Sequence, residues 1–394
     1  MKKGWKYKKL GEVFSSINNG ANIKQIKGAN GIPITRIETL SNDKFNRDRM
    51  GYANIGDITP YASYILNEGD ILMSHINSMK FLGRSVAYSK KGDETIIHGM
   101  NLLRLVPTMN VLSSFMIYQF QTSFFKDQIL QISHQSVNQA SFNISNLKGL
   151  NIMVPPLEQQ QRIVDYLNAA FAQIDELKNN AERQLAEARA LFHSALTQAM
   201  QPKPGWQEYK IMEIGDVIGG TTPSTSNPNY WGGDKCWISP AELHGEKYLY
   251  DSVKKITEEA VIAKNLKLLP EGTVILSSRA PIGKVAINKV PMYCNQGFKC
   301  IVCGPRIFNE FLYWWLWGNT DYLNSIGTGA TFAEISKTVV QNIIIRIPSK
   351  PEQEKIAARL DGYYSFVHRL EHIQNEIITE CDALKQALLR QIFE

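Results

Sequence analysis

The chain contains two copies of one pattern, and this internal repeat constrains its fold more than any other feature of the sequence. The copies align without insertion over their last segments, where Ile163 corresponds to Ile356 (356−163 = 193) and Leu191 corresponds to Leu384 at the same offset. Such self-similarity is typical of proteins with a pseudo-twofold axis. The repeat therefore predicts two similar units and a binding partner that also has two halves.

A heptad pattern follows Pro155 in the first copy and Pro348 in the second. Apolar residues alternate there in the spacing of a coiled-coil seam, with one stutter in the first copy. The stretch from Ile163 to Ala199 corresponds to a helix about 55 Å long, which matches about 16 base pairs of DNA. We expect two antiparallel helices that pack through Ile163, Leu167, Ile174, Leu177 and Leu185 of the first and Ile356, Leu360, Val367, Leu370, Leu384 and Leu388 of the second.

The remainder of each copy alternates short strands with one helix. A Gly turn followed by an apolar run predicts a buried strand at Glu68–Ser74 and again at Glu271–Ser277. Helices are expected over Phe115–Leu130 and Phe311–Ile326, and the second contains three tryptophans. Stacked bases are one use for these side chains, but the first copy has no matching aromatic stripe, which favours a buried helix.

These elements predict an α+β fold, with two pseudo-symmetric mixed α/β domains separated by a long antiparallel two-helix coiled coil. The predicted segments are a globular domain over 1–155, a helix over 156–200, a second globular domain over 201–348 and a second helix over 349–394.

Composition restricts the class of protein without identifying its function. A net charge of +6 and a pI near 8.8 suit contact with a polyanion but do not require it. No apolar run has membrane-spanning length, so we expect a cytoplasmic protein. Cys294, Cys300 and Cys303 have no thiol counterparts in the first copy, which favours small buried side chains over zinc ligands.

No catalytic motif is present. Gly283-Lys284 lacks the remaining residues of a phosphate-binding loop, and the seven histidines form no metal-binding pair. We therefore expect a protein that recognises a partner and performs no chemistry.

Several segments of the second copy resemble the DNA specificity subunits of type I restriction-modification enzymes. The resemblance covers nearly the whole chain and is carried by these segments: Gly219–Ser224, Tyr230–Gly233, Trp237–Pro240, Leu276–Gly283, Asn295–Phe298 and Gly327–Phe332. The entry to the first long helix, Pro155–Ile163, also matches the family. The second helix entry departs from that pattern, and the first copy lacks the Gly-Gly-Thr-Pro-Ser run, so its contact loops are less well defined.

The resemblance implies that the two globular domains are target-recognition domains, each reading one half of a bipartite double-stranded DNA target. It also implies that the helices are spacers, to which two methyltransferase (modification) subunits and motor-nuclease (restriction) subunits attach. S-adenosylmethionine, ATP and magnesium are expected in those partner subunits, and this chain is expected to hold no cofactor or metal.

Recognition of DNA requires donors and acceptors on loops, together with cations for phosphate. The candidate DNA-binding residues in the second copy are Thr221, Thr222, Ser224, Arg279, Lys284, Thr328 and Thr331. Those in the first copy are His75, Asn77, Ser78, Lys80, Arg84, Gln135, Ser136, Asn138 and Gln139. For Arg279, a bidentate contact with guanine and a structural role in its loop remain equally open.

Two other functions are compatible with parts of the sequence. A self-contained DNA methyltransferase or nuclease with fused recognition domains would bind S-adenosylmethionine by itself, but the repeats leave no room for a cofactor-binding fold. A coiled-coil adaptor without a DNA role would explain the helices but not the two globular domains, and it would show no salt-dependent DNA binding.

Overall fold

The computed structural model describes residues 4–26, 31–41, 43–137, 139–328 and 333–394. The chain divides into two compact units, a first unit of Met1–Ala181 with Glu376–Glu394 and a second unit of Glu182–Asn375. The boundary between them falls within both long helices, α4 (Leu157–Met200) and α10 (Lys350–Phe393). The compact units thus cut across the four predicted segments, whose boundaries stay a prediction.

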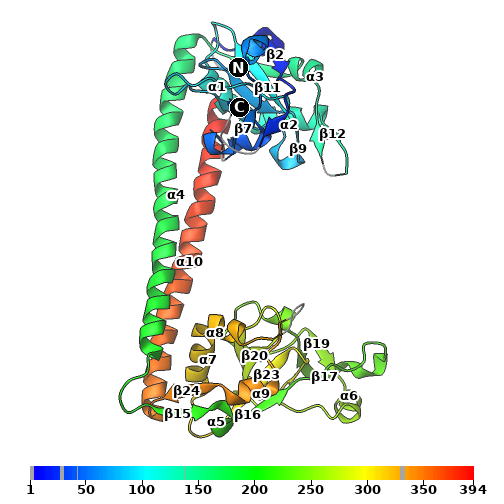
Figure 1. Ribbon diagram of the computed structural model, residues 1–394, viewed down its shortest axis with the longest axis vertical. Coiled ribbons are helices and arrows are strands. Elements are labelled where there is room, and N and C mark those ends of the chain that lie inside the picture. Colours follow the sequence, from blue (N-terminus) through cyan, green and yellow to red (C-terminus); the bar gives the residue numbers. More distant parts are fainter. Residues whose placement is uncertain (1–3, 27–30, 42, 138, 329–332) are drawn as a thin grey trace. The chain divides into compact units, whose positions relative to one another are not determined.

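The first unit is built around the antiparallel sheet β10-β8-β11-β2, with smaller sheets β12-β13-β9, β3-β7-β4, β1-β14 and β5-β6 (Figure 1). Its strands are β1 (Lys6–Lys9), β2 (Phe14–Asn19), β3 (Gln25–Ile26), β4 (Ile32–Ile34), β5 (Leu40–Ser41), β6 (Lys44–Phe45), β7 (Gly51–Ala53), β8 (Ile71–Ser74), β9 (Ile76–Asn77), β10 (Ser85–Ala87), β11 (Leu102–Pro107), β12 (His134–Gln135), β13 (Ala140–Ser141) and β14 (Asn151–Val154). Its short helices are α1 (Ser113–Phe120), α2 (Ser123–Ile132) and α3 (Ile144–Lys148).

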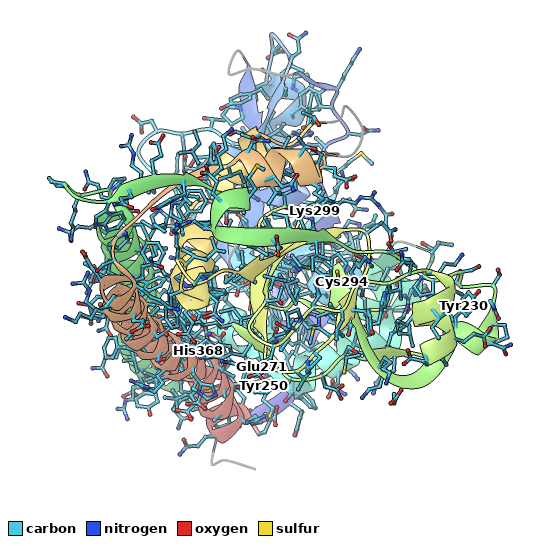
Figure 2. The ribbon with its side chains drawn as sticks, turned by 90° about the horizontal axis from the view of Figure 1, so that it is seen from below. Tyr230, Tyr250, Glu271, Cys294, Lys299 and His368 are labelled. Carbon is cyan, nitrogen blue, oxygen red and sulfur yellow. The ribbon has the colours of Figure 1, made fainter. Side chains whose placement is uncertain are left out.

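The second unit repeats this plan around the sheet β16-β23-β20-β21-β18, with smaller sheets β19-β17-β22 and β15-β24. Its strands are β15 (Gln207–Lys210), β16 (Gly215–Gly219), β17 (Trp231–Ile238), β18 (Tyr248–Leu249), β19 (Lys254–Ile256), β20 (Val274–Ser277), β21 (Val285–Asn288), β22 (Tyr293–Cys294), β23 (Phe298–Cys303) and β24 (Ile344–Ile347). Its short helices are α5 (Ile211–Ile214), α6 (Glu258–Ala263), α7 (Asn309–Gly318), α8 (Thr320–Ser325) and α9 (Lys337–Asn342). Tyr230 lies at the end of this unit away from α10, which carries His368 (Figure 2). The mixed helix and strand content confirms the predicted fold class.

The tryptophan-rich helix α7 is part of the core of the second unit. Trp314 is fully buried, and its ring contacts Phe192 of α4 and Tyr364 of α10 at centroid distances of 5.6 and 5.4 Å. Its Nε1 donates to Asp361 at 3.0 Å, so a tryptophan joins the globular part to the long helix. The expectation of a buried helix is confirmed, because a side chain in this position cannot stack on a base.

The helices predicted over Phe115–Leu130 and Phe311–Ile326 are each divided into two shorter helices in the structure. The first breaks at Thr122, whose backbone is extended and whose Oγ1 accepts a hydrogen bond from Phe125 N at 3.2 Å. This contact caps a new helix, α2, because it pairs one of the free N–H groups at its start. The second breaks at Asn319, between α7 and α8. Apolar periodicity continues through both breaks, which is why the sequence predicts one helix.

A buried glutamine holds the start of each long helix against the sheet connection. Gln160 is fully buried, donates from Nε2 to Asn110 O and Pro155 O at 3.0 and 2.9 Å, and accepts from Leu112 N at 2.9 Å. Gln353 makes the same three bonds in the second unit, to Arg306 O, Pro348 O and Phe308 N. Each amide therefore pairs with two backbone carbonyls and one backbone N–H at the start of its helix.

We expect Gln160→Ala to lower the free energy of unfolding by about 3 kcal/mol, because it leaves buried backbone donors and acceptors unpaired. The matched control is Gln161→Ala, which changes an exposed side chain that donates a hydrogen bond to Asp165. The comparison is the midpoint of urea denaturation of the two variants. Equal midpoints would show that the buried amide does not stabilise the junction.

In the first unit, α4 and α10 run antiparallel, because Lys178 Nζ lies 2.8 Å from Asp382 Oδ1 and Lys385 pairs with Asp175. Leu167 and Ile174 are buried, and Ile163 and Leu388 are half-buried. Two predicted packing residues are wrong, since Leu177 is 53% and Leu384 50% exposed. Lys178 takes the seam position instead, since it is half-buried and its ammonium reaches Asp382. With Lys178 in the seam, the extra four-residue step lies at Ala170–Ile174–Lys178 instead of Leu177–Ala181–Leu185, so the expected stutter is displaced along the helix.

In the second unit, the same two helices pack through Leu185, Ile356 and Leu360, which are buried, and through Val367 and Leu370, which are half-buried. This seam also contains a polar residue. Gln374 is only 6% exposed and donates from Nε2 to Gln184 Oε1 at 3.0 Å. Arg189 Nε lies 2.6 Å from Glu371 Oε1, which confirms the antiparallel direction here.

Two smaller findings complete the fold. Cys294 of β22 and Cys300 of β23 belong to different sheets and are buried with their Sγ atoms 3.5 Å apart, and Cys303 is half-buried. Among the residues that the structure describes, no helix is both long and apolar enough to span a membrane.

Candidate nucleic-acid interface

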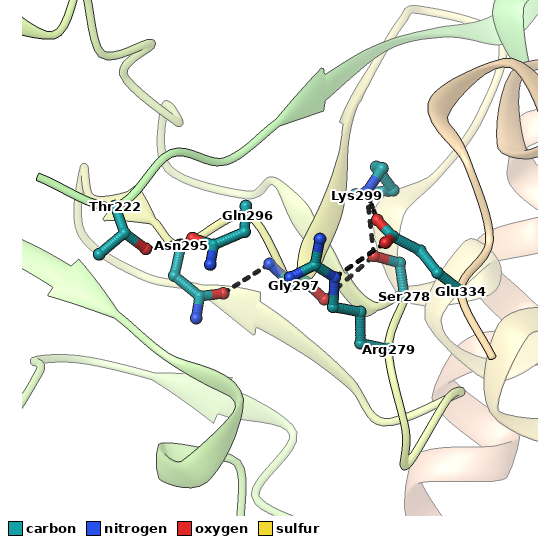
Figure 3. Close-up of polar contacts among 8 residues, drawn as sticks. All are labelled: Thr222, Ser278, Arg279, Asn295, Gln296, Gly297, Lys299 and Glu334. Carbon is teal, nitrogen blue, oxygen red and sulfur yellow. Dashed lines mark hydrogen bonds and ion pairs between the residues drawn. The ribbon is translucent and has the colours of Figure 1, made fainter. Parts of the chain in front are cut away.

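Three loops of the second unit meet at one face, and a glycine permits their close approach. Thr221 N donates to Cys294 O at 2.9 Å. A Cβ added to Gly220 would lie 1.8 Å from Asn295 O, so no other residue fits there without moving the backbone. The contact places Thr222 beside Gln296, and the Thr222 hydroxyl donates to Gln296 Oε1 (Figure 3). The sequence motifs around Gly220 and Asn295 are therefore the two sides of one contact.

Charged side chains join the third loop to this face. Arg279 Nε donates to Glu334 Oε2 at 2.9 Å, and Lys299 Nζ, which is largely buried, donates to Glu334 Oε1 at 3.1 Å (Figure 3). Lys299 also donates to Ser278 Oγ at 3.1 Å. Burial raises the pKa of Glu334, but the hydrogen bonds from Lys299 and Arg279 outweigh it, so its pKa lies below the ordinary value. The ion pair with Glu334 gives Arg279 a contact within the fold, and both its structural role and its guanine contact stay predictions.

The first unit forms the same loop contact although its sequence lacks the Gly-Gly-Thr-Pro-Ser run. Ala21 N donates to His98 O at 2.8 Å, and a Cβ on Gly20 would lie 2.4 Å from that oxygen. Gly20 therefore takes the place of Gly220, and His98 takes that of Cys294 (294−98 = 196). Burial lowers the pKa of His98 to about 4, so the imidazole is neutral at pH 7 and its Nε2–H donates to Leu102 O at 2.8 Å.

The two groups of candidate residues in the first unit lie together. Strand β13 pairs with β9, placing Ala140 opposite Asn77, and Phe142 N donates to His75 O at 3.2 Å. Strands β12 and β13 form a hairpin whose tip is exposed at Gln135, Ser136 and Gln139. Ser136 N donates to Gln139 O at 2.8 Å and closes the turn. His75 itself is buried, which lowers its pKa, so its ring is not at the surface.

The two candidate cations Arg84 and Lys284 occupy equivalent places in the two units. Lys284 Nζ donates to Leu243 O at 2.7 Å, and Arg84 Nη1 donates to Leu40 O at 3.3 Å. The same carbonyl is used in each unit (243−40 = 203), so both cations hold a loop in place. A contact of either cation with phosphate stays a prediction.

The other candidates are distributed over the same loops. Ser78, Lys80 and Thr328 are exposed, and the Ser224 hydroxyl pairs with that of Ser226 at 2.8 Å. Thr328 N donates to Glu334 O at 3.0 Å. Asn138 and Thr331 lie outside the described residues.

Sequence reasoning missed three members of the second-unit face, namely Gln296, Lys299 and Glu334. Gln296 lies in a motif typical of the resemblance, which was a signal that could have selected it. Lys299 and Glu334 gave no signal of this kind, because one lies inside an apolar strand and the other beyond a Gly-rich loop. Only their pairing across the fold identifies them.

A family model and the most similar known proteins point to the same family. A family described as "Type I restriction modification DNA specificity domain" matches residues 2–187 and 203–379. The chain is similar to a putative type I restriction enzyme MjaX specificity subunit from Methanocaldococcus jannaschii, with 30% identity over 90% of this chain and 86% of the relative. The MjaIX specificity subunit of the same organism is 42% identical over 44% of this chain and 41% of the relative.

Two solved structures share the fold. One is a chain described under "Structural basis underlying complex assembly and conformational transition of the type I R-M system". It has a TM-score of 0.80 and 19% identity, covering 99% of this chain and 98% of that one. The other is the HsdS subunit from Thermoanaerobacter tengcongensis, with a TM-score of 0.62 and 19% identity, covering 100% of this chain and 97% of that one.

Proposed function

Because the chain belongs to the type I restriction-modification DNA specificity family, we propose that it directs a type I restriction-modification complex to a bipartite DNA target. Each unit reads one half of the target. The observation that best supports this proposal is one shared loop scaffold with different side chains. Gln296 corresponds to Met100 (296−100 = 196) and Arg279 corresponds to Ile76 (279−76 = 203). A conserved frame with changed side chains is expected where two units read different sequences.

The proposed subunit is not an enzyme by itself. Two methyltransferase subunits and the motor-nuclease subunits assemble on it, and they hold S-adenosylmethionine, ATP and magnesium. The sequence supports this division, because it contains no phosphate-binding loop and no catalytic triad. The complex works in the cytoplasm, where it meets the chromosome.

The proposal is tested by mapping DNA methylation in host cells with and without this chain. We expect one bipartite motif to be methylated only when the chain is present. Loss of no motif, or loss of a continuous one, would contradict the proposed function.

Exposed leucines on the long helices support docking of partner subunits there. Leu177 on α4 and Leu384 on α10 are both about half exposed, and in the first unit Tyr166 of α4 is 54% exposed as well. Covering the exposed half of each such side chain contributes about 1 kcal/mol to binding of a partner. We therefore propose that these side chains form part of the contact with the methyltransferase.

We expect the double variant Leu177→Asp, Leu384→Asp to bind the methyltransferase subunits at least about tenfold more weakly, because each change removes apolar area and adds charge. The measurement is a titration of purified chain with methyltransferase subunits. Gln173→Asp is the control, since it adds the same charge at an exposed polar position of α4. Equal affinities of the double variant and the wild type would place the contact elsewhere.

A further inference from the structure

The first unit has a polar hollow on its loop face. The hollow has a volume of about 340 Å³ and is lined mainly by Gln25, Thr35, Arg36, Glu38, Met100 and Asn101. We call it the Arg36 pocket. None of these residues was selected from the sequence as a candidate DNA contact, because the predicted contacts follow β8 and the β12–β13 hairpin.

Two loops that line the Arg36 pocket are equivalent to the Gly220 and Asn295 loops of the second-unit face, and the third is equivalent to the loop that begins at Ser239. Ala21 at its edge is equivalent to Thr221, because each donates its N–H to the same carbonyl position, His98 or Cys294. Arg36 N donates to Thr39 Oγ1 at 2.9 Å, as Ser239 N does to Glu242 Oε1 at 3.2 Å. The pocket is therefore at the place where Thr222 meets Gln296 in the other unit.

The two charged side chains of the Arg36 pocket are available to a ligand. Arg36 and Glu38 are exposed, and neither side chain forms an ion pair with another residue that the structure describes. Gln25 Oε1 is buried and has no hydrogen-bond partner within the described part of the chain. Gln25 and Arg36 both lie over Gly51, since a Cβ there would be 2.2 Å from Gln25 Oε1 and 3.1 Å from Arg36 Cδ. Gly51 thus makes room for both side chains.

We infer that the Arg36 pocket reads a G·C base pair in the half-target bound by the first unit, an inference that rests on the proposed function. The Arg36 guanidinium donates to O6 and N7 of guanine, the most common specific contact in the major groove. The Glu38 carboxylate accepts a hydrogen bond from N4 of the paired cytosine. Arg36 and Glu38 are therefore specificity-determining residues.

The charges in the Arg36 pocket favour a base edge over phosphate. A phosphate site gathers cations, whereas here a carboxylate lines the same hollow as the guanidinium and would repel a phosphate oxygen. A G·C edge presents acceptors on guanine and a donor on cytosine, which is the complement of one guanidinium and one carboxylate.

The test uses the complex of this chain with its methyltransferase subunits, whose wild-type motif is determined first. We then expect Arg36→Ala to reduce the preference for G·C at one position of one half-target by roughly 5- to 150-fold, while the other half is unchanged. Glu38→Gln should relax the same position. Arg36→Lys should also relax the preference at this position, because an ammonium keeps the positive charge but cannot make the two parallel hydrogen bonds of a guanidinium. Arg49→Ala is the control, an exposed arginine outside the pocket.

Three results would overturn the inference. They are an unchanged motif in Arg36→Ala, relaxation at an A·T position, and wild-type selectivity in Arg36→Lys with a uniform, salt-dependent loss in Arg36→Ala. The last result would identify a phosphate contact. A wild-type complex that methylates no bipartite motif would instead contradict the proposed function, so the two failures are distinguishable.

Discussion

Gly220→Ala is expected to weaken binding of the assembled complex to its target DNA by about tenfold or more, because overpacking at this contact costs about 1–3 kcal/mol. The added Cβ would lie 1.8 Å from the backbone oxygen of Asn295, and a backbone atom cannot rotate away as a side chain does. The loop that carries Thr222 must therefore separate from the loop that carries Gln296. The measurement is the dissociation constant for target DNA at fixed salt.

The neighbouring glycine supplies a matched control for this prediction. A Cβ on Gly219 meets no atom within 4 Å, so Gly219→Ala adds the same methyl group in open space. We expect its affinity to stay within about twofold of the wild type. If both variants bind DNA equally well, the contact between the two loops does not support recognition. Gly20→Ala should repeat the effect of Gly220→Ala for the other half-target, because Gly20 makes the equivalent contact.

Removing one heptad from each long helix is expected to change the gap tolerated between the two half-targets by about three base pairs. The deleted residues are 174–180 of α4 and 380–386 of α10, which face each other in the first unit. Seven residues shorten a helix by about 10 Å, or about three base pairs of DNA. They also correspond to nearly two full turns, so the helix faces change by only about 20°.

This deletion is chosen so that two ion pairs between the helices are removed as whole pairs. Both ion pairs of the segment, Asp175 with Lys385 and Lys178 with Asp382, are removed complete. The measurement is the methylated motif of the shortened variant, and the control inserts one heptad at the same place, which should lengthen the gap by a similar amount. Retention of the original gap in both variants would show that the helices are not the spacer.

The sequence does not predict which residues of the long helices form their buried seam. Apolar spacing predicts Leu177 and Leu384 as packing residues, because a leucine is the expected choice for a buried helix position. In the structure Lys178 is half-buried and both leucines are exposed. Adjacent helix residues differ by 100°, so a seam that contains Lys178, which pairs with Asp382, leaves Leu177 on the exposed side of the helix. A single sequence does not contain that pairing, since Asp382 lies far away in the chain.

The loop faces show the same division between what the sequence predicts and what it does not. The motifs around Gly220 and Asn295 were recognisable, but their mutual contact was not. In the first unit, the candidates after β8 came from alignment of the copies, whereas Arg36 and Glu38 belong to a region where the copies share few residues. Their position on the face follows only from the bonds of Ala21 and Arg36 to their neighbours.

The sequence by itself determined that this chain has two similar units, two long helices and no evident catalytic motif. It could do so because repeats, heptads and motifs are local patterns that survive without knowledge of contacts. The tertiary structure alone decided which residue of each heptad is buried, which glycines permit loops to touch and which polar side chains share one face. These properties depend on contacts between atoms from distant parts of the chain. Local sequence patterns do not predict the distances in such contacts.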